Sequence, residues 1–87
     1  MKHAWIEELA QVVMGIRNKQ EMIEFFHGLF TDGELEEVTR RLQIVKKLKA
    51  GVPQHEIAKE LGVGVATVTR GSKELQRGRF KNVVSSR

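Results

Sequence analysis

The sequence of 87 residues contains no cysteine. It therefore has no disulfide framework, no cysteine ligand for a metal and no cysteine nucleophile. Hydrophobic residues make up 40% of the chain, yet no apolar run approaches the roughly 20 residues that a membrane span requires. The N-terminus also lacks the pattern of a signal peptide. These absences predict a cytoplasmic protein that does not cross a membrane.

Patterns of catalytic and metal-binding residues are missing as well. The three histidines, His3, His27 and His55, are scattered and do not have the spacing of metal ligands. The sequence shows no pairing of a nucleophile with a base and no phosphate-binding loop of the Walker type. It therefore predicts neither a metal site nor an enzymatic activity.

Charge is distributed unevenly along the chain. Residues 1–39 carry three Lys or Arg and eight Asp or Glu, a net charge of 3 − 8 = −5. Residues 40–87 carry twelve and three, a net charge of 12 − 3 = +9. A basic half of this kind favours a polyanionic ligand, although a solvated lysine-rich surface would have the same composition. The chain is long enough for one small domain, to which dimerisation would add stability.

The basic half contains the pattern of a DNA-binding helix-turn-helix between residues 54 and 72. A short amphipathic helix is followed by a glycine, where the turn needs a positive φ, and then by a second helix. A small residue in the first helix allows the two helices to approach closely. The residues that carry this pattern are Ile57, Ala58, Leu61, Gly62, Val63, Val65 and Val68.

Three further helices are predicted before this motif. Apolar residues recur at helical spacing within residues 3–17. Asn18 and the glutamate three residues later have the spacing of a capped helix start. Thr31 and Glu34 have the spacing of a capping box, and the helix that they begin would stop at Gly51.

We therefore expect an all-α fold of about five helices. Trp5 and the phenylalanines of the second helix are interpreted as core residues, so this helix should be buried. Pro53 suits the first turn of the fourth helix, and the fifth helix should span residues 65–76. The expected organisation is a single helical domain over residues 1–76, with core and dimerisation helices in 1–50 and the helix-turn-helix in 53–76, followed by a short, basic, mobile tail over 77–87.

The second helix of the motif indicates which residues would contact DNA. Its N-terminal end enters the major groove, where threonines can reach base edges and methyl groups can contact thymine. Lys and Arg further along the helix, and the residues that begin the first helix, are better placed for phosphates. Any one of these cations could instead be only solvated. The predicted DNA contacts are Gln54, His55, Val65, Ala66, Thr67, Thr69, Arg70, Ser72, Lys73 and Arg77, of which Ser72 falls on the packing side of the helix.

The sequence also resembles a known family. From Leu29 to Leu75 it is similar to the bacterial trp repressor and its trp-repressor-like relatives. The run Ala-Thr-Val-Thr-Arg-Gly-Ser that ends at Ser72 is close to the signature of the reading helix. The Leu-Phe-Thr entry to the third helix and its Arg-Leu-Gln-Ile-Val run also match. The resemblance implies an all-helical, intertwined homodimer that presents two reading heads to a palindromic operator.

The resemblance further implies L-tryptophan as a corepressor, bound between the third and fifth helices. Carried over by position, Arg41 and Arg70 would flank the indole. Arg70 would also meet the carboxylate, with Thr31 nearby and Gly71 leaving room for the ring. Guanidinium planes do stack on aromatic faces. Glu74 replaces a serine near the ligand's amino group, so it could pair with the ammonium or indicate a different ligand.

Two other departures from the family pattern leave alternatives open. The segment before the fourth helix is one residue shorter than in the enteric repressor, and the basic tail replaces a final helix. We predict a sequence-specific transcriptional regulator, most simply a repressor, that binds DNA as a dimer. The alternatives are a DNA-binding relative with no effector or another one, and a helical adaptor or antitoxin-like module. The last would show no salt-dependent binding to duplex DNA.

Overall fold

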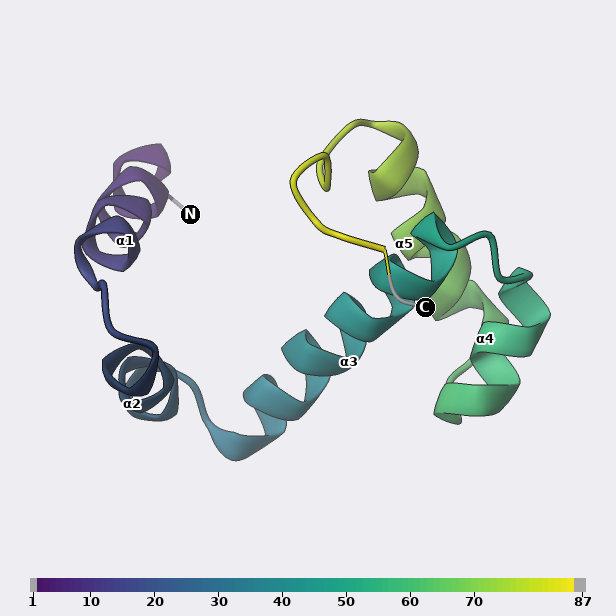
Figure 1. Ribbon diagram of the computed structural model, residues 1–87, viewed down its shortest axis with the longest axis horizontal. Coiled ribbons are helices and arrows are strands. Elements are labelled where there is room, and N and C mark those ends of the chain that lie inside the picture. The colour runs from purple at the N-terminus through teal and green to yellow at the C-terminus, as the bar shows by residue number, and fades with distance from the viewer. Residues whose placement is uncertain (1, 86–87) are drawn as a thin grey trace. The chain divides into compact units, whose positions relative to one another are not determined.

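The computed structural model describes residues 2–85. Within this range the chain forms five α-helices and no strand. They are α1 (His3–Gly15), α2 (Lys19–Leu29), α3 (Asp32–Lys49), α4 (Gln54–Leu61) and α5 (Val65–Gln76) (Figure 1). The prediction of an all-α fold with about five helices is confirmed. In the same range, no helix is long and apolar enough to cross a membrane.

The chain divides into two compact units, Met1–Leu35 and Glu36–Arg87. The first unit holds α1, α2 and the first turn of α3. Helix α1 ends at Gly15, because Ile16 takes an extended conformation with φ −87° and ψ 118°. The predicted extension of this helix to residue 17 is therefore wrong. Asn18 caps α2 as predicted, since its Oδ1 accepts a hydrogen bond from the Glu21 N–H at 3.1 Å.

The predicted capping box at the start of α3 is confirmed. The Thr31 N–H donates to Oε1 of Glu34 at 2.9 Å, and the Glu34 N–H donates to Oγ1 of Thr31 at 3.1 Å. The backbone N–H of Thr31 and, after it, the Thr31 side chain favour the ionised carboxylate and lower the pKa of Glu34. Two N–H groups that the helix itself leaves unpaired are thus satisfied reciprocally.

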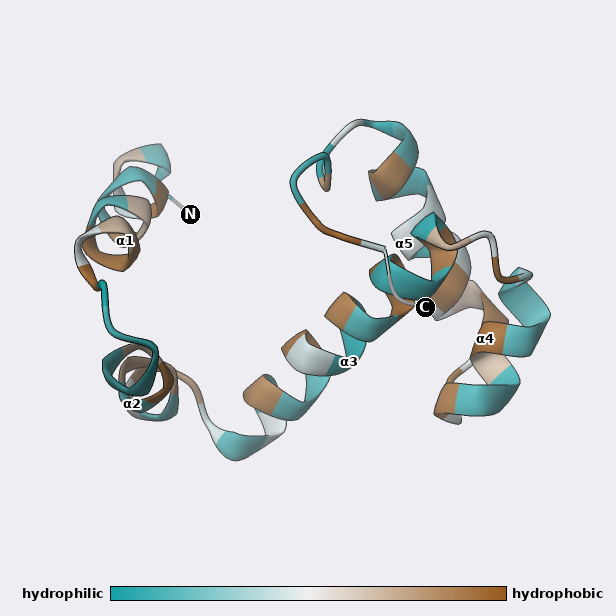
Figure 2. Cartoon of the chain, in the orientation of Figure 1, coloured by the Kyte–Doolittle hydropathy of each residue, from teal (hydrophilic) through white to brown (hydrophobic). Residues whose placement is uncertain are grey.

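Apolar side chains of the first unit are largely exposed. No residue of α1 or α2 is buried, and Trp5 is 62% exposed. The interpretation of Trp5 and of α2 as buried core is therefore wrong for a single chain. Two helices and one turn offer too little surface to cover each other. Figure 2 shows hydrophobic positions (brown) along both α1 and α2.

The core of the second unit lies where α3, α4 and α5 meet. Side chains that are at most 2% exposed come from all three helices: Ile44 and Val45 from α3, Ile57 from α4 and Val68 from α5. Complete burial of such a side chain is worth about 1.5–3 kcal/mol. Ala58 completes the cluster, and the partly buried residues packed against it are Leu48, Val52, Leu61 and Val63.

The turn between α4 and α5 has the conformation that the sequence predicts. Gly62 lies in the left-handed region with φ 65° and ψ 36°, and its N–H bonds to the Ala58 carbonyl. The Val63 N–H donates to the same carbonyl at 3.0 Å. Pro53 precedes α4 as its N-cap and is not part of its first turn. Helix α5 spans the predicted residues 65–76.

The segment after α5 makes defined turns and contacts α3. Residues 77–82 form consecutive turns, and the Lys49 ammonium donates hydrogen bonds to carbonyl groups of this segment, including that of Phe80 at 2.6 Å. Figure 1 shows the segment (yellow-green to yellow) turning back from the end of α5. Residues 77–83 therefore have defined contacts with α3, and the mobility of the tail stays a prediction. The last two residues of the predicted tail lie outside the described part of the chain.

Candidate nucleic-acid interface and effector pocket

The first turn of α5 presents small side chains to solvent. Gly64 is extended, with φ −72° and ψ 149°, and its carbonyl accepts a hydrogen bond from the Thr67 N–H at 3.1 Å. Val65, Ala66 and Thr67 are all exposed. The Thr67 hydroxyl has no hydrogen-bond partner among residues 2–85. This end of α5 therefore offers methyl groups and one uncommitted hydroxyl, the groups that contact base edges in a major groove.

Two residues that were predicted to contact DNA, Gln54 and Thr69, are hydrogen-bonded to each other. The Thr69 hydroxyl lies 2.7 Å from Oε1 of Gln54 and 3.0 Å from the Val65 carbonyl oxygen. Both side chains are partly buried, and Gln54 is the first residue of α4. The contact joins the two helices of the motif through a partly buried hydrogen bond.

The predicted phosphate contacts fall into two groups. Arg70 and Lys73 are exposed, and their side chains form no ion pair or hydrogen bond within the described range. Arg77 is also exposed, but its guanidinium bonds to the Glu74 carboxylate at 2.9 Å. His55 is exposed near the start of α4, whereas Ser72 is partly buried beside the core. Their role in binding DNA stays a prediction.

A cavity of about 300 Å³ lies between α3 and α5. The structure brings together four of the five predicted ligand residues here, Arg41, Arg70, Gly71 and Glu74. Thr31 is not among the residues that line it. The function of all five residues as ligand contacts stays a prediction. The remaining lining residues are Glu37, Val45, Thr67 and Phe80.

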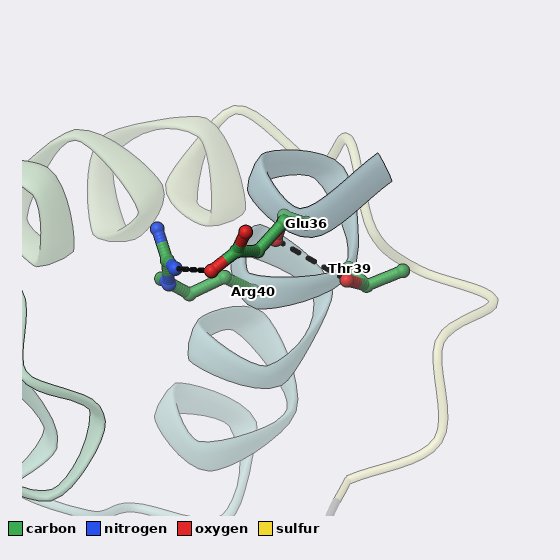
Figure 3. A network of polar contacts seen from close by, with 3 residues as sticks. All are labelled: Glu36, Thr39 and Arg40. Carbon is green, nitrogen blue, oxygen red and sulfur yellow. Dashed lines mark hydrogen bonds and ion pairs between the residues drawn. The ribbon is translucent and has the colours of Figure 1, made fainter. Parts of the chain in front are cut away.

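Charges around the cavity are unequally paired. The Arg41 guanidinium bonds to the Glu37 carboxylate at 2.7 Å, one helical turn away. Arg40 forms a parallel pair with Glu36 at 2.9 Å, which Figure 3 shows on a different side of α3 from the Thr39 side chain. Among the two arginines of the cavity wall, only Arg70 lacks an ion pair with a described residue. Of these two guanidinium groups, that of Arg70 is therefore the one available to pair with an anionic group of a ligand.

Gly71 has a packing role as well as a place in the cavity wall. A Cβ atom built on it would lie 3.2 Å from Cγ2 of Ile44 and 3.6 Å from Cδ1 of Leu48. The absence of a side chain therefore lets α5 approach α3 closely. The sequence suggested a ligand as the reason for this glycine, and contact between helices is a second reason.

Sequence reasoning missed several members of the cavity wall. Glu37 and Arg41 are four residues apart, a spacing that pairs side chains on a helix and could have indicated their contact. Phe80 gave no such signal, because it reaches the cavity only through the turns that follow α5. Of the described residues, no group of three or more His, Cys, Asp or Glu could hold a metal ion.

Comparisons with a family model and with individual proteins point to the same family. The model of the family described as Trp repressor protein matches residues 4–85. A Trp operon repressor homolog of Vibrio cholerae serotype O1 is 39% identical over 74 residues, which cover 83% of this chain and 70% of that protein. The homolog of Vibrio campbellii is 34% identical over 71 residues, which cover 80% and 71%.

A relative without an assigned function matches over a similar length. The uncharacterized protein YerC of Bacillus subtilis is 27% identical over 73 residues, which cover 84% of this chain and 70% of that protein. No solved structure gives a significant match. The family match spans nearly all of the described residues and includes both the helix-turn-helix and the cavity. The chain therefore belongs to the Trp repressor family, a regulatory and non-enzymatic family.

Proposed function

We propose that the protein is a sequence-specific DNA-binding transcriptional regulator, most simply a repressor. One observation carries the proposal: the helix-turn-helix exposes the first turn of α5 together with the unpaired cations Arg70 and Lys73. The first turn would read base edges, and the cations would contact phosphates. The net charge of +9 over residues 40–87 supports a polyanionic partner.

A dimer is part of this proposal. Each of the two units exposes apolar side chains that a second copy would cover, such as Leu9 at 41% in the first unit and Val38 at 41% and Leu42 at 44% in the second. Two reading helices would then face a palindromic operator, about 34 Å apart. Sedimentation at micromolar concentration should show a dimer, and a clean monomer would contradict this part of the proposal.

The cavity between α3 and α5 would hold a small effector. Relatives are named Trp operon repressor homologs, so L-tryptophan is the ligand that we propose as corepressor. Arg41 and Arg70 would flank the ring, and Arg70 would pair with the carboxylate. The Glu74 carboxylate already contacts Arg77 and Arg79, so it is not free to serve the ligand's ammonium alone.

In vitro selection of duplex sequences, with and without L-tryptophan, tests these proposals together. The protein should enrich a palindromic sequence, and its affinity should fall linearly on a log–log plot against salt concentration. A requirement for tryptophan in the selection would support the corepressor. Failure to enrich any duplex at low salt would instead favour the helical adaptor, which binds no DNA.

A further inference from the structure

The segment Arg77–Val83, here called the strap, leaves α5 through a defined turn. Gly78 has φ +78°, and its N–H donates to the Leu75 carbonyl at 3.0 Å. The Arg79 N–H donates to the Glu74 carbonyl at 3.3 Å. These two bonds form the Schellman pattern, which ends a helix and sends the chain in a new direction. The strap is therefore turned back toward α3 instead of continuing along the axis of α5.

Lys49, the last residue of α3, anchors the far end of the strap. Its ammonium donates to the carbonyl oxygen of Phe80 at 2.6 Å and also contacts those of Lys81, at 3.5 Å, and Val83. Lys49 is partly buried, so these contacts are less screened by solvent than those of a surface lysine. An ammonium group has three donor hydrogens, which suits several carbonyl acceptors. A single side chain thus links the end of α3 to three backbone positions of the strap.

The near end of the strap is fixed to α5. Both oxygens of the Glu74 carboxylate are engaged, by Nη1 of Arg77 at 2.9 Å and by Nε of Arg79 at 3.5 Å. Between the two ends, Phe80 lines the cavity together with Val45 of α3 and Gly71 of α5. The strap therefore bridges α3 and α5 with one polar anchor on each helix and an aromatic ring between them.

We propose that Lys49 is a positioning residue for DNA recognition, acting through the strap on the reading helix α5. The inference rests on the proposed function. Helix α5 packs directly on α3 at Gly71. The strap, which follows the C-terminal end of α5, connects the same two helices a second time. Loss of that connection would let α5 change its tilt without losing the core around Val68. Base contacts depend on this tilt, whereas contacts with phosphates tolerate a change in it.

The alternative for Lys49 is an ordinary phosphate contact, and salt dependence separates the two roles. Removing a phosphate contact weakens binding to all sequences about equally and reduces the salt slope by about 1. Removing a positioning residue weakens binding to the selected sequence only and leaves the slope unchanged. Lys46 is the matched control, because it lies one turn earlier on α3, is also partly buried, and its side chain forms no hydrogen bond or ion pair with the strap.

The test measures affinity for a selected and a random duplex over a range of salt concentrations. K49M should bind the selected duplex about tenfold more weakly, from the loss of charge-assisted hydrogen bonds, with unchanged affinity for random DNA. F80A, which alters no charge, should reproduce this loss. K46M should retain the ratio of the two affinities. An equal loss on both duplexes with a reduced slope for K49M would overturn the proposal.

Amide hydrogen exchange of the DNA-free protein provides a readout that does not depend on the proposed function. K49M and F80A should exchange faster than the wild type in the last turns of α5, while K46M should not. If the wild type bound no duplex at all, the proposed function would fail, and exchange would still decide whether the strap restrains α5. Unchanged exchange in both K49M and F80A would refute the restraint itself.

Discussion

The Thr69 hydroxyl contacts Oε1 of Gln54 across 2.7 Å and ties the middle of α5 to the first residue of α4. A hydroxyl has one hydrogen to donate, and here both nearby acceptors, Gln54 and the Val65 carbonyl, belong to the protein. Thr67, two residues earlier, has an uncommitted hydroxyl and is exposed. We infer that the two threonines differ in role, Thr67 contacting bases and Thr69 orienting the helix.

Replacement of each threonine by valine should separate these roles, since valine keeps the shape and removes the hydroxyl. T69V should lower the free energy of unfolding by about 1 kcal/mol, because Gln54 loses its partner. T67V should change it by less than about 0.5 kcal/mol, yet weaken specific DNA binding by about 1–3 kcal/mol. Urea unfolding and duplex titration measure the two quantities. Unchanged stability of T69V would show that the contact with Gln54 contributes nothing.

Local signals in the sequence were sufficient to predict that the helices exist, although not where each of them ends. The capping box at Thr31, the glycine of the turn at Gly62 and the span of α5 depend on residues close together in the chain, and all three were predicted. The end of α1 was missed because Ile16 fits the apolar periodicity although its backbone is extended. Periodicity reports which side chains could share a face, and it does not report where the backbone leaves the helix.

Long-range contacts could not be predicted in the same way. Lys49 and Phe80 are 31 residues apart, and only the turn at Gly78 brings them together. The burial of Trp5 and α2 was predicted from hydrophobicity, but burial needs a covering surface, which one chain does not supply. Arg41, Arg70, Gly71 and Glu74 were placed together through family resemblance, since no local pattern in the sequence links α3 to α5.

The capping box predicts a dependence of stability on pH. The pKa of Glu34 is lowered in the folded state by the Thr31 N–H and side chain. The ionised Glu34 carboxylate therefore makes its full contribution to the free energy of unfolding at pH values above the ordinary glutamate pKa. This contribution is lost as the pH falls through the lower pKa of the folded state. E34Q should flatten the acid limb of a plot of unfolding free energy against pH, measured by urea titration.

Glu24 provides the control for this experiment. It is an exposed glutamate of α2 outside any capping position, so E24Q removes the same charge without touching the capping box. E24Q should keep the acid limb of the wild type. T31A should cost about 1 kcal/mol at neutral pH through loss of the cap. A full acid limb in E34Q would show that the capping box does not couple to pH.

Gly71 should resist replacement by alanine although it lies inside a helix. Alanine gains about 1 kcal/mol of helix propensity over glycine, but its Cβ would meet Cγ2 of Ile44 at 3.2 Å. Ile44 is 2% exposed and β-branched, so it has little freedom to move. We expect G71A to lower the free energy of unfolding by about 1 kcal/mol net, within the range for overpacked cores.

Gly33 is the matched control for this substitution. It lies in α3, and a Cβ atom built on it meets nothing within 4 Å. G33A should therefore be neutral or stabilising by up to about 1 kcal/mol, from helix propensity alone. Thermal or urea unfolding of both variants measures the difference. If G71A were as stable as G33A, close contact between α3 and α5 would not be the reason for the glycine.

Removal of one arginine at a time should define the effector cavity. Calorimetry of the wild type should detect L-tryptophan binding, and R70A and R41A should each weaken it at least about tenfold through loss of a charge-assisted contact. R40A is the control, because Arg40 neighbours Arg41 and has a similar ion pair, with Glu36, but does not line the cavity. Equal binding by all three variants would place tryptophan elsewhere. Absence of heat with the wild type would remove tryptophan as the effector, and DNA binding would still be tested by the duplex selection.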